Sequence, residues 1–388
     1  MIYIILLVIG IGAVFANLLI LGFWINARRL YKNEKPPSFS PKISVIVPCK
    51  DIHERFTENV KAICNQDYED YVVVFITDSE NDPAYIQLKS IINDNPKIRL
   101  ETADYIEGCS GKISALIKGT TIFDDVDVYV FADSDIKPHT QWLSNLVGHL
   151  DEKDVGATTG YRWYFTHNLK SYLISTWNLA SVLPFFYPAL NYTWGGSTAI
   201  KKSLFEELDI ADKWKKGFAD DLILTESIKN GGYKIKFMPK CIIENSTGDD
   251  TGNFLSWGTR QFTWVKWYYP SAWFKSFIRL AGVKILILIG ILLLFMGYVI
   301  PGILMISTFL IEILYGWQAI TTIKKLTYYE KEKLGRSWLY ALLMPLALFV
   351  NLYNYLGSAV STEVTWCGRK YKKKDIKGLV KTGAINEK

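Results

Sequence analysis

The stretch Asp127–Pro138 reads DVYVFADSDIKP and joins a strand signal to a pair of carboxylates. Val128–Phe131 is an apolar run of β-formers that is typical of a buried strand, and Pro138 prevents further strand pairing. Asp133 and Asp135 follow the strand on alternate residues. Because ligands of open α/β sheets bind beyond the carboxyl ends of the strands, two such carboxylates can share a hard cation and a phosphate-bearing ligand. The alternative is a solvated acidic turn, since Asp and Ser are ordinary turn residues.

Three further apolar runs precede this stretch and alternate with helical patterns. The runs are Ile43–Pro48, Tyr71–Ile76 and Ile98–Glu101, and the helical patterns cover Glu54–Asn65, Ala84–Ile92 and Lys112–Lys118. This alternation predicts βαβ units, and therefore an α/β fold with a mostly parallel sheet. Lys50 and Asp78 follow the first two runs, as Asp133 follows Val128–Phe131. Because strand ends at one edge of a sheet converge on one crevice, we expect a nucleotide site there.

Two glycine-containing stretches allow two interpretations each. Gly108–Lys112 reads GCSGK and lacks the spacing of a P-loop. Unless it is a plain loop, it would bring a cation and backbone N–H groups to a diphosphate. Trp194–Thr198 reads WGGST, in which Gly195 and Gly196 permit either the close approach of a ligand or a turn.

The adjacent Asp220 and Asp221 precede an amphipathic helical pattern at Leu222–Ile228. A helix N-cap accounts for one of the two carboxylates. The second is in excess, and repulsion between the two near an apolar wall would raise the pKa of one toward the range of a general base.

The stretch Arg260–Trp267, RQFTWVKW, places Arg260, Trp264 and Trp267 on one side of a helix, with Lys266 beside them. Tryptophan next to Lys or Arg commonly marks a membrane interface. The sharper alternative is that these side chains stack on a sugar ring or steer a diphosphate.

Apolar segments at both ends predict an integral, multi-pass membrane protein. Met1–Trp24 is long enough to span a bilayer, and the basic flank Arg28-Arg29 puts residue 1 outside and the following residues in the cytoplasm. Phe277–Ile300, closed by Pro301, and Gly302–Ile323 are two further predicted spans.

The last apolar segment, Trp338–Val360, contains Pro345, Asn351 and Asn354. A full crossing would put the basic cluster Arg369–Lys374 outside, against the positive-inside rule. We therefore expect this segment to be re-entrant, a broken hairpin or interfacial. The predicted domains are an anchor at 1–25, a linker at 26–41, a cytoplasmic catalytic domain at 42–270, transmembrane or re-entrant helices at 271–362 and a basic cytoplasmic tail at 363–388.

Composition narrows the classes of function. Hydrophobic residues make up 49% of the 388 residues and gather at the two ends, while much of the net charge of +6 comes from clusters beside apolar segments. Such clusters set membrane topology or contact anionic lipid, so nucleic acid is not an expected partner. The five cysteines are scattered without Cys-x-x-Cys spacing, so neither a zinc site nor a redox site is predicted.

Taken in order, these motifs resemble the membrane-bound inverting glycosyltransferases of the GT-A fold, and among them the ceramide glucosyltransferase-like group. The resemblance runs from Met1 to about Lys374. It rests on SVIVPCKD (Ser44–Asp51), Asp78 with Asp82-Pro83-Ala84, GKISAL (Gly111–Leu116), ADSD (Ala132–Asp135), GGSTAI (Gly195–Ile200), ADD (Ala219–Asp221), RQFTW (Arg260–Trp264) and VTWCGRKY (Val364–Tyr371).

The resemblance implies a role for each matching residue. Pro48 and Asp78 would bind the uridine part of a UDP-sugar, and Lys112 and Asp133 would face its diphosphate and sugar. Lys50 would also bind the nucleotide sugar. Asp135 would bind a divalent cation, Mg²⁺ or Mn²⁺, and Asp221 would take the proton from the acceptor hydroxyl. The acceptor and pyrophosphate region would contain Gly195, Gly196, Asp220, Arg260, Trp264 and Lys266.

The implied function is inverting transfer of glucose or a related hexose from a UDP-sugar to a membrane lipid hydroxyl at the cytoplasmic face. The sequence departs from the family where Thr263 replaces the arginine of the Gln/Arg-x-x-Arg-Trp motif, and Lys266 is expected to supply the missing charge. Three alternatives remain: a polysaccharide synthase of the same fold, a polyprenyl-phosphate sugar transferase, and an inactive membrane binding protein. The intact Asp133, Asp135 and Asp221 argue against the last.

Overall fold

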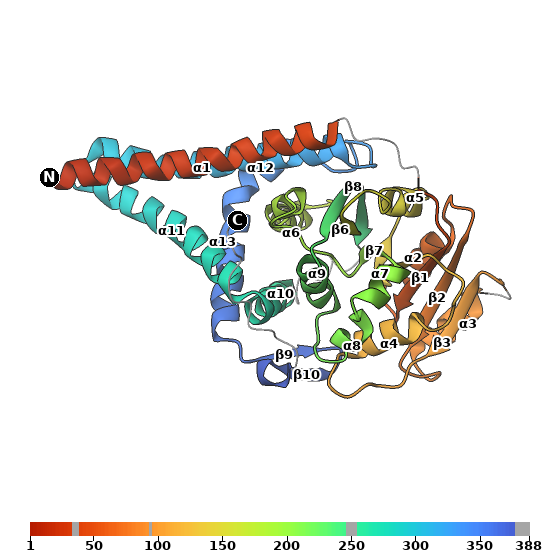
Figure 1. Cartoon of the computed structure of the whole chain (residues 1–388). Coiled ribbons are helices and arrows are strands. Elements are labelled where there is room, and N and C mark those ends of the chain that lie inside the picture. Colours follow the sequence, from red (N-terminus) through yellow and green to blue (C-terminus); the bar gives the residue numbers. More distant parts are fainter. Residues whose placement is uncertain (33–38, 93–94, 246–253, 377–388) are drawn as a thin grey trace. The chain divides into compact units, whose positions relative to one another are not determined.

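The computed structural model describes residues 1–32, 39–92, 95–245 and 254–376 of the chain, which is drawn in Figure 1. The chain divides into two compact units. The helical unit comprises residues 1–35, 163–187 and 248–361, and the sheet unit comprises residues 36–162, 188–247 and 362–388. These units cut across the domain bounds expected from the sequence, and those bounds stay a prediction.

The sheet unit is organised around eight strands in the order β3-β2-β1-β4-β7-β6-β8-β5. Their bounds are β1 Ile43–Pro48, β2 Tyr71–Thr77, β3 Ile98–Thr102, β4 Val128–Ala132, β5 Ile136–Lys137, β6 Val155–Trp163, β7 Ser197–Lys201 and β8 Lys234–Asn245. Strands β1 to β4 form a parallel half, in which Ile43 pairs with both Tyr71 and Val128. Strand β7 pairs antiparallel with β4 and β6, and β5 pairs antiparallel with β8.

The parallel half confirms the predicted βαβ units. The helices of the sheet unit are α2 Phe56–Cys64, α3 Pro83–Ile92, α4 Gly111–Gly119, α5 Trp142–Val147, α7 Lys202–Glu207, α8 Ile210–Trp214 and α9 Asp220–Asn230. The apolar runs became strands because both of their faces are covered: Val45, Val73 and Val130 are completely buried. This arrangement brings the carboxyl ends of β1, β2 and β4 to one edge of the sheet.

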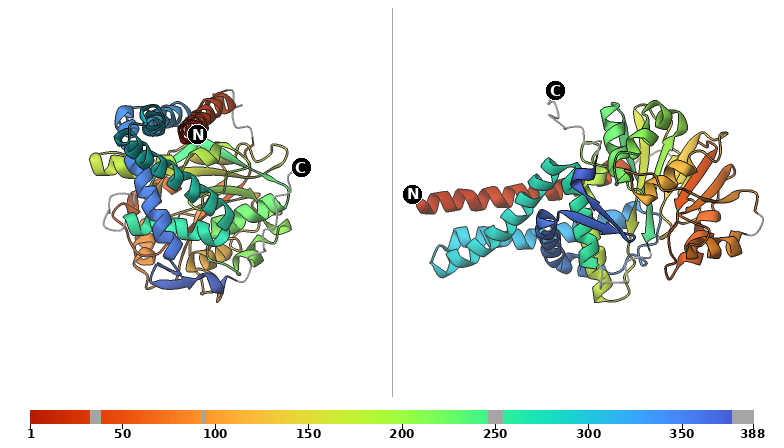
Figure 2. Two further views of the ribbon diagram at one scale, coloured as in Figure 1. Left: turned by 90° about the vertical axis from the view of Figure 1, so that its left-hand side faces the viewer. Right: turned by 90° about the horizontal axis from the view of Figure 1, so that it is seen from below.

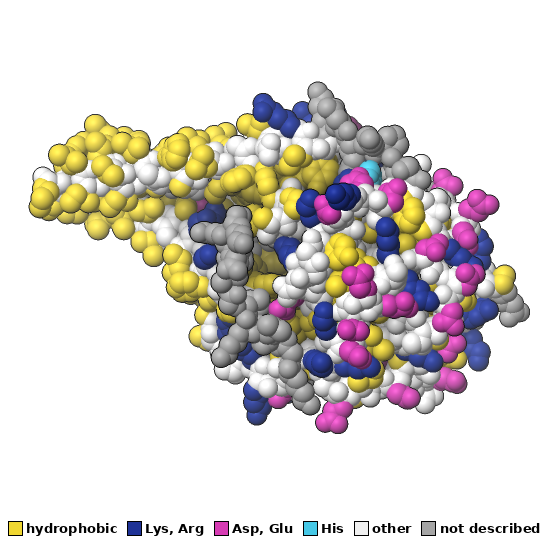
Figure 3. Space-filling view, viewed as in Figure 1, with side chains coloured by type: hydrophobic (Ala, Val, Ile, Leu, Met, Phe, Trp, Pro, Cys, Tyr) yellow, Lys and Arg dark blue, Asp and Glu magenta, His cyan; other side chains and the backbone are white. Residues whose placement is uncertain are grey.

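The helical unit contains α1 Ile2–Lys32, α6 Leu169–Ala180, η1 Leu183–Phe186, α10 Phe254–Tyr268, α11 Pro270–Phe295, α12 Val299–Leu326 and α13 Ser337–Val360. Within the described residues, α1, α11, α12 and α13 are long and apolar enough to cross a membrane. Hydrophobic side chains cover the long helices at the left of Figure 3. The chain is therefore a membrane protein, as its composition predicted.

The first helix is longer than the predicted anchor. Helix α1 continues to Lys32, so residues 26–32 of the expected linker are helical. Residues 33–38 lie outside the described residues. Arg28 explains the extension, because its Nε donates to Thr322 Oγ1 at 2.6 Å and its Nη2 donates to the Gln318 carbonyl at 3.2 Å. These bonds hold α1 alongside α12, as Figures 1 and 2 show.

The predicted boundary between the second and third spans is wrong. Pro301 does not close the second span, because α11 already ends at Phe295 and Pro301 lies in the first turn of α12. Gly297, with φ +82°, makes the turn between the helices, and a proline is tolerated in the first turn of a helix.

Of the three alternatives for Trp338–Val360, the broken hairpin is wrong. Helix α13 is continuous and contains Pro345 within it. Asn354, which suggested a break, is instead satisfied by neighbouring helices of the unit. Its Oδ1 accepts from Trp177 Nε1 at 3.0 Å, and its Nδ2 donates to the Leu255 carbonyl at 3.0 Å.

The predicted basic tail is partly folded. Strands β9 Glu363–Trp366 and β10 Arg369–Lys372 form an antiparallel hairpin, followed by η3 Lys373–Asp375. The hairpin belongs to the sheet unit, because Val364 and Tyr371 are buried in it. Residues 377–388 lie outside the described residues.

Candidate active site

The two carboxylates of the DSD motif leave the sheet between β4 and β5. Asp133 follows the last residue of β4, and Asp135 precedes β5. The carbonyl of Ser134 between them is held from α2 and the turn before it, by His53 Nε2 at 3.1 Å and by Asn59 Nδ2 at 3.2 Å. These bonds fix the backbone of the motif, so the directions of both carboxylates are set by the fold.

Lys112 lies among carboxylates from two distant parts of the sequence. Its Nζ is 2.7 Å from Asp133 Oδ1 and 3.3 Å from Asp220 Oδ2, and its side chain is only 14% exposed. Lys112 and Asp133 were both predicted to face a donor diphosphate, and the structure brings them together. It also shows that the ammonium charge of Lys112 is already shared between two carboxylates. We call Lys112, Asp133, Asp220 and Asp221 the Lys112 cluster.

Asp221 is not a helix N-cap. Helix α9 begins at Asp220, Ala219 precedes it, and no side chain caps this end. Asp221 Oδ1 instead accepts a hydrogen bond from the next backbone N–H, that of Leu222, at 2.8 Å. The capping alternative raised by the sequence therefore does not explain either carboxylate.

The Lys112 cluster has more negative than positive charge. Burial and then the neighbouring Asp220 raise the pKa of Asp221 to about 7. Burial also raises the pKa of Asp220, although Lys112 opposes this shift. One ammonium is therefore too little charge for three carboxylates, and Asp221 is the one whose pKa moves to the range suited to proton transfer at neutral pH.

Gly195 lies directly against the cluster. A Cβ at this position would be 2.5 Å from Asp220 Oδ2 and 2.8 Å from Lys112 Nζ, so no larger residue fits. A Cβ at Gly196 would meet the ring of Trp194. From the sequence, Gly195 and Gly196 permitted either the close approach of a ligand or a turn. In the structure, the group that lies close to Gly195 is the protein's own Lys112–Asp220 ion pair.

Three of the residues predicted to bind the nucleotide sugar, Pro48, Lys50 and Asp78, lie at the ends of β1 and β2. Pro48 is the last residue of β1 and pairs with Ile76 of β2. Lys50 Nζ lies 2.5 Å from Asp78 Oδ2 in a half-exposed ion pair. The structure therefore brings Lys50 and Asp78 into contact beside the strand end that Pro48 forms.

Arg369 of β10 was missed as a site residue, although it lies in the VTWCGRKY motif. Its Nη2 is 3.8 Å from Asp78 Oδ2, and its guanidinium lies 3.9 Å from the centroid of the Tyr105 ring. A Gly-Arg pair after the last apolar segment was the available signal. It was interpreted only as part of a basic tail.

The remaining predicted residues, Arg260, Trp264 and Lys266, lie on α10 in the helical unit. Lys266 Nζ donates to the carbonyls of Ser358, Ala359 and Ser361 at the end of α13, the last two at 3.1 and 3.0 Å. Its ammonium therefore stabilises a helix C-terminus. Its expected part in binding a diphosphate stays a prediction, as do the roles of Arg260 and Trp264.

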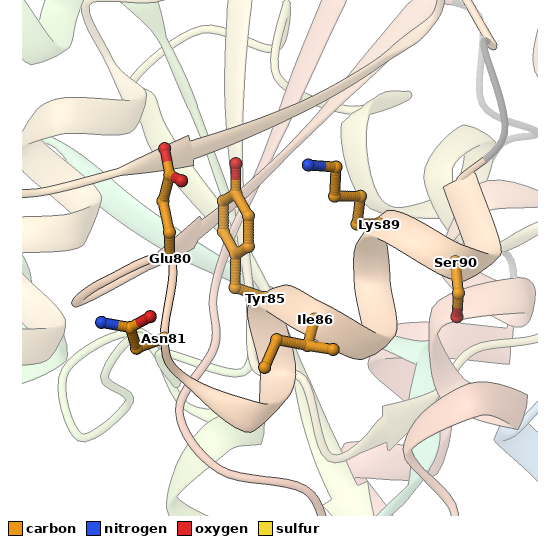
Figure 4. Close-up of a pocket in the computed structure, with 6 residues that line it drawn as sticks. All are labelled: Glu80, Asn81, Tyr85, Ile86, Lys89 and Ser90. Carbon is orange, nitrogen blue, oxygen red and sulfur yellow. The ribbon is translucent and has the colours of Figure 1, made fainter.

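A surface hollow elsewhere on the sheet unit is separate from these residues. It has a volume of about 370 Å³ and is lined by Glu80, Asn81, Tyr85, Ile86, Lys89 and Ser90. Figure 4 shows Tyr85 and Lys89 extending from α3 toward the side on which Glu80 lies. The hollow contains none of the predicted site residues, so it adds nothing to the Lys112 cluster.

Asp135 is the residue expected to bind a metal. Burial and then the charge of Asp133 raise the pKa of Asp135 to about 6. Both carboxylates offer the oxygen ligands that Mg²⁺ and Mn²⁺ prefer. Among the described residues, no group of three or more His, Cys, Asp or Glu side chains is arranged to hold a metal ion. The protein would thus provide part of a coordination shell, as is usual for Mg²⁺ beside a phosphate ligand.

Two curated proteins are similar to this chain over more than half of its length. "Probable glycosyltransferase YdaM" of Bacillus subtilis is 24% identical over 59% of this chain and 53% of its own. "Ceramide glucosyltransferase 1" of Caenorhabditis elegans is 21% identical over 66% of this chain and 56% of its own. The chain therefore spans about half the length of each relative.

Solved structures give a remoter likeness. A mannosyltransferase from Pyrobaculum calidifontis, solved in complex with GDP-Man and Mn²⁺, is 16% identical, with a TM-score of 0.48, over 92% of this chain and 98% of its own. Glucosyl-3-phosphoglycerate synthase from Mycobacterium tuberculosis, solved with Mn²⁺ and UDP-Glc, is also 16% identical, with a TM-score of 0.35, over 56% of this chain and 72% of its own. Likenesses at these scores are too remote to bear on function.

The family match covers nearly the whole chain. Residues 3–377 match the model described as Glycosyl transferase family 21. The match includes every motif on which the resemblance was based, and with the parallel half of the sheet it confirms the predicted α/β fold of the GT-A type. The protein therefore belongs to glycosyl transferase family 21.

Proposed function

We propose that this glycosyltransferase moves glucose or a related hexose from a UDP-sugar to a membrane lipid hydroxyl, with inversion and with Asp221 as the general base. The observation that carries the proposal is Asp221 itself: a partly buried carboxylate, at the start of α9, whose pKa is raised to about 7. A base with this pKa is half deprotonated at neutral pH and still basic enough to accept a proton from a hydroxyl.

The donor would bind along the strand ends of the parallel half. Pro48, Lys50 and Asp78, at the ends of β1 and β2, are the candidates for the nucleoside. Asp133 and Asp135, at the end of β4, are the candidates for the diphosphate end of the donor. Support comes from the order of these strands, because β2, β1 and β4 are adjacent and all point the same way.

The donor set fits a divalent cation, Mg²⁺ or Mn²⁺. Asp133 and Asp135 would hold it, with phosphate oxygens and water completing its coordination. When bound, the cation would neutralise charge that accumulates on the departing diphosphate. Support comes from the charge around Asp135: burial and Asp133 raise its pKa although Lys112 and Arg162 oppose the shift, so a bound cation would stabilise its charged form.

Asp221 would act on the acceptor. Its carboxylate would accept the hydroxyl proton as the acceptor oxygen forms a bond to the anomeric carbon, while the bond from that carbon to the diphosphate breaks. A phosphate acceptor carries no proton that must be removed at neutral pH. The pKa of Asp221 therefore favours a hydroxyl acceptor over the polyprenyl-phosphate alternative. The name of the nematode relative and the apolar helices favour a lipid as its carrier.

We propose that α1, α11 and α12 cross the membrane and that α13 lies along its cytoplasmic interface. The ends of α1 and α12 that carry Arg28 and Lys324 are adjacent, because Arg28 donates to Thr322 and Gln318. Three crossings then leave residue 1 outside and the sheet unit in the cytoplasm, in agreement with the positive-inside rule.

The hairpin after α13 supports this topology. Strands β9 and β10 belong to the sheet unit, which also contains β1 to β8. The segment after α13 would therefore lie on the cytoplasmic face, as would the segment before α13, which follows the end of α12 that lies beside Arg28. A single helix of 24 residues that begins and ends on the same face would lie along the bilayer surface. Reporters fused after Ser40 and at Lys388 are both expected to be cytoplasmic, and an external signal from the second would contradict this topology.

Calorimetry on the full-length protein in detergent tests the donor and the metal. UDP is expected to bind in the presence of Mn²⁺ or Mg²⁺ and to bind much more weakly in EDTA. GDP is the matched control for the identity of the nucleobase. Equal UDP affinity in EDTA would overturn the metal assignment, and preference for GDP would overturn the uridine assignment. Mass spectrometry of lipids from cells that express the protein then identifies the acceptor. The absence of any new glycolipid would contradict the proposal that the acceptor is a lipid.

A further inference from the structure

The β9–β10 hairpin is fixed on the sheet unit at the edge where the predicted nucleoside residues lie. Tyr371 is buried, its ring centroid is 4.8 Å from that of Phe218, and its hydroxyl is hydrogen-bonded to the backbone of Gly111. Gly111 begins α4, next to Lys112, and Phe218 lies two residues before Asp220. The hairpin thus contacts two of the three segments that build the Lys112 cluster.

Arg369 extends from this hairpin toward the end of β2. Its guanidinium lies over the Tyr105 ring, and its Nη2 is 3.8 Å from Asp78 Oδ2. Its Nη1 is buried and has no hydrogen-bond partner among the described residues. A Cβ on Gly111 would be 3.6 Å from that nitrogen, so the glycine leaves the guanidinium close to the first turn of α4. A buried, permanently charged donor without a hydrogen-bond partner is stabilised when a ligand supplies an acceptor.

The charges around Arg369 differ from those in the Lys112 cluster. Lys50 and Arg369 both face Asp78, which gives two cations for one carboxylate. The N-terminus of α4, a nine-residue helix, adds partial positive charge beside them. Lys112, by contrast, is neutralised by Asp133 and Asp220. The uncompensated positive charge of this sheet edge therefore lies at Arg369, where an anionic ligand would meet it.

We infer that the β9–β10 hairpin forms a wall of the donor site and that Arg369 binds the nucleoside diphosphate part of the donor. This inference rests on the proposed function, and it adds a binding residue from beyond the last apolar helix. Arginine suits the task because its planar fork donates two parallel hydrogen bonds to phosphate.

Calorimetry with UDP and Mn²⁺ on the full-length protein tests the inference. Arg369→Gln is expected to weaken UDP binding by roughly 10- to 100-fold, the range for losing a hydrogen bond to a charged group. Arg369→Lys keeps the charge but not the planar fork, so its affinity for UDP should lie between those of the wild type and Arg369→Gln. Lys370→Gln is the matched control, because Lys370 lies next along the same strand and its ammonium pairs with Glu363 of the same hairpin. It should bind UDP as the wild type does.

A wild-type measurement covers the case in which Arg369→Gln does not fold. Cys367, exposed in the hairpin turn, can be labelled with a maleimide and its peptide quantified. Saturating UDP with Mn²⁺ should slow this labelling several-fold, and an unchanged rate would overturn the inference, as would wild-type affinity in a folded Arg369→Gln protein. If the wild type binds GDP instead, the same variants are measured with GDP. If it binds neither nucleotide, the proposed function fails, and the hairpin assignment with it.

Discussion

Each compact unit buries a lysine that is paired with acidic side chains, and the two sites differ in charge balance. In the helical unit, Lys284 Nζ is 2.7 Å from both oxygens of Glu312, and both side chains are almost fully buried. In the sheet unit, Lys112 pairs with Asp133 and Asp220, with Asp221 next in the chain. The first site is balanced, one charge against one. The second has an excess of negative charge.

This difference separates a structural pair from a reactive site. A balanced buried pair satisfies its own charges and leaves none for a ligand, so the Lys284–Glu312 pair is suited to joining α11 to α12. An unbalanced cluster leaves a carboxylate such as Asp221 with a raised pKa, which is the usual mark of an acid–base site. The comparison therefore predicts which substitutions reduce sugar transfer and which reduce stability.

The largest expected effect is on the unbalanced site. Asp221→Asn should fold and bind UDP, yet lose roughly 10²–10⁴-fold in transfer rate, because the amide cannot accept the acceptor proton. Transfer of labelled hexose to membrane lipids measures the loss. Glu226→Gln is the matched control: Glu226 is another partly buried carboxylate of α9, and burial also raises its pKa. A folded Asp221→Asn protein with normal turnover would remove Asp221 from the mechanism.

The next effect distinguishes the two lysines. Lys284→Met should lower the free energy of unfolding by about 3–5 kcal/mol, because it leaves Glu312 buried without its partner. The double substitution Lys284→Met with Glu312→Leu should recover most of that loss and retain transfer activity. Lys112→Met with Asp220→Asn should remain inactive whatever its stability. Recovery of transfer in this second pair would show that the Lys112 cluster is only structural.

Much of the fold was predictable because its strands carry local signals. The ends of β1 and β4 were predicted to within one residue, since each is a mostly apolar run of β-formers that ends at Pro48 or just before Asp133. Strand β5 has only two residues and forms by pairing with the far end of β8, for which no local pattern exists. The broken hairpin, one of three alternatives for α13, was wrong because the side chain of Asn354 is satisfied by residues distant in sequence.

The site was predictable in its residues but not in its contacts. Asp133 and Asp221 were identified from their positions after a strand and before a helix. That Lys112 would be neutralised by Asp220 depends on how α4 and α9 pack, which no local pattern encodes. Arg369 was overlooked for the same reason, because its contacts with Tyr105 and Asp78 come from the opposite end of the sheet unit's sequence.

The smallest effect is the most direct test of the central claim, that excess negative charge around Lys112 makes Asp221 a base near neutral pH. The pKa of Asp221 is raised to about 7, so the carboxylate is protonated and inactive below that pH and deprotonated above it. The measurement is the transfer rate of the wild type at saturating donor and metal, from about pH 5.5 to about pH 8.5. The rate should rise by roughly tenfold per pH unit on the acid side and level off above about pH 7. A rate that stays constant over this range, or falls as the pH rises, would contradict the account.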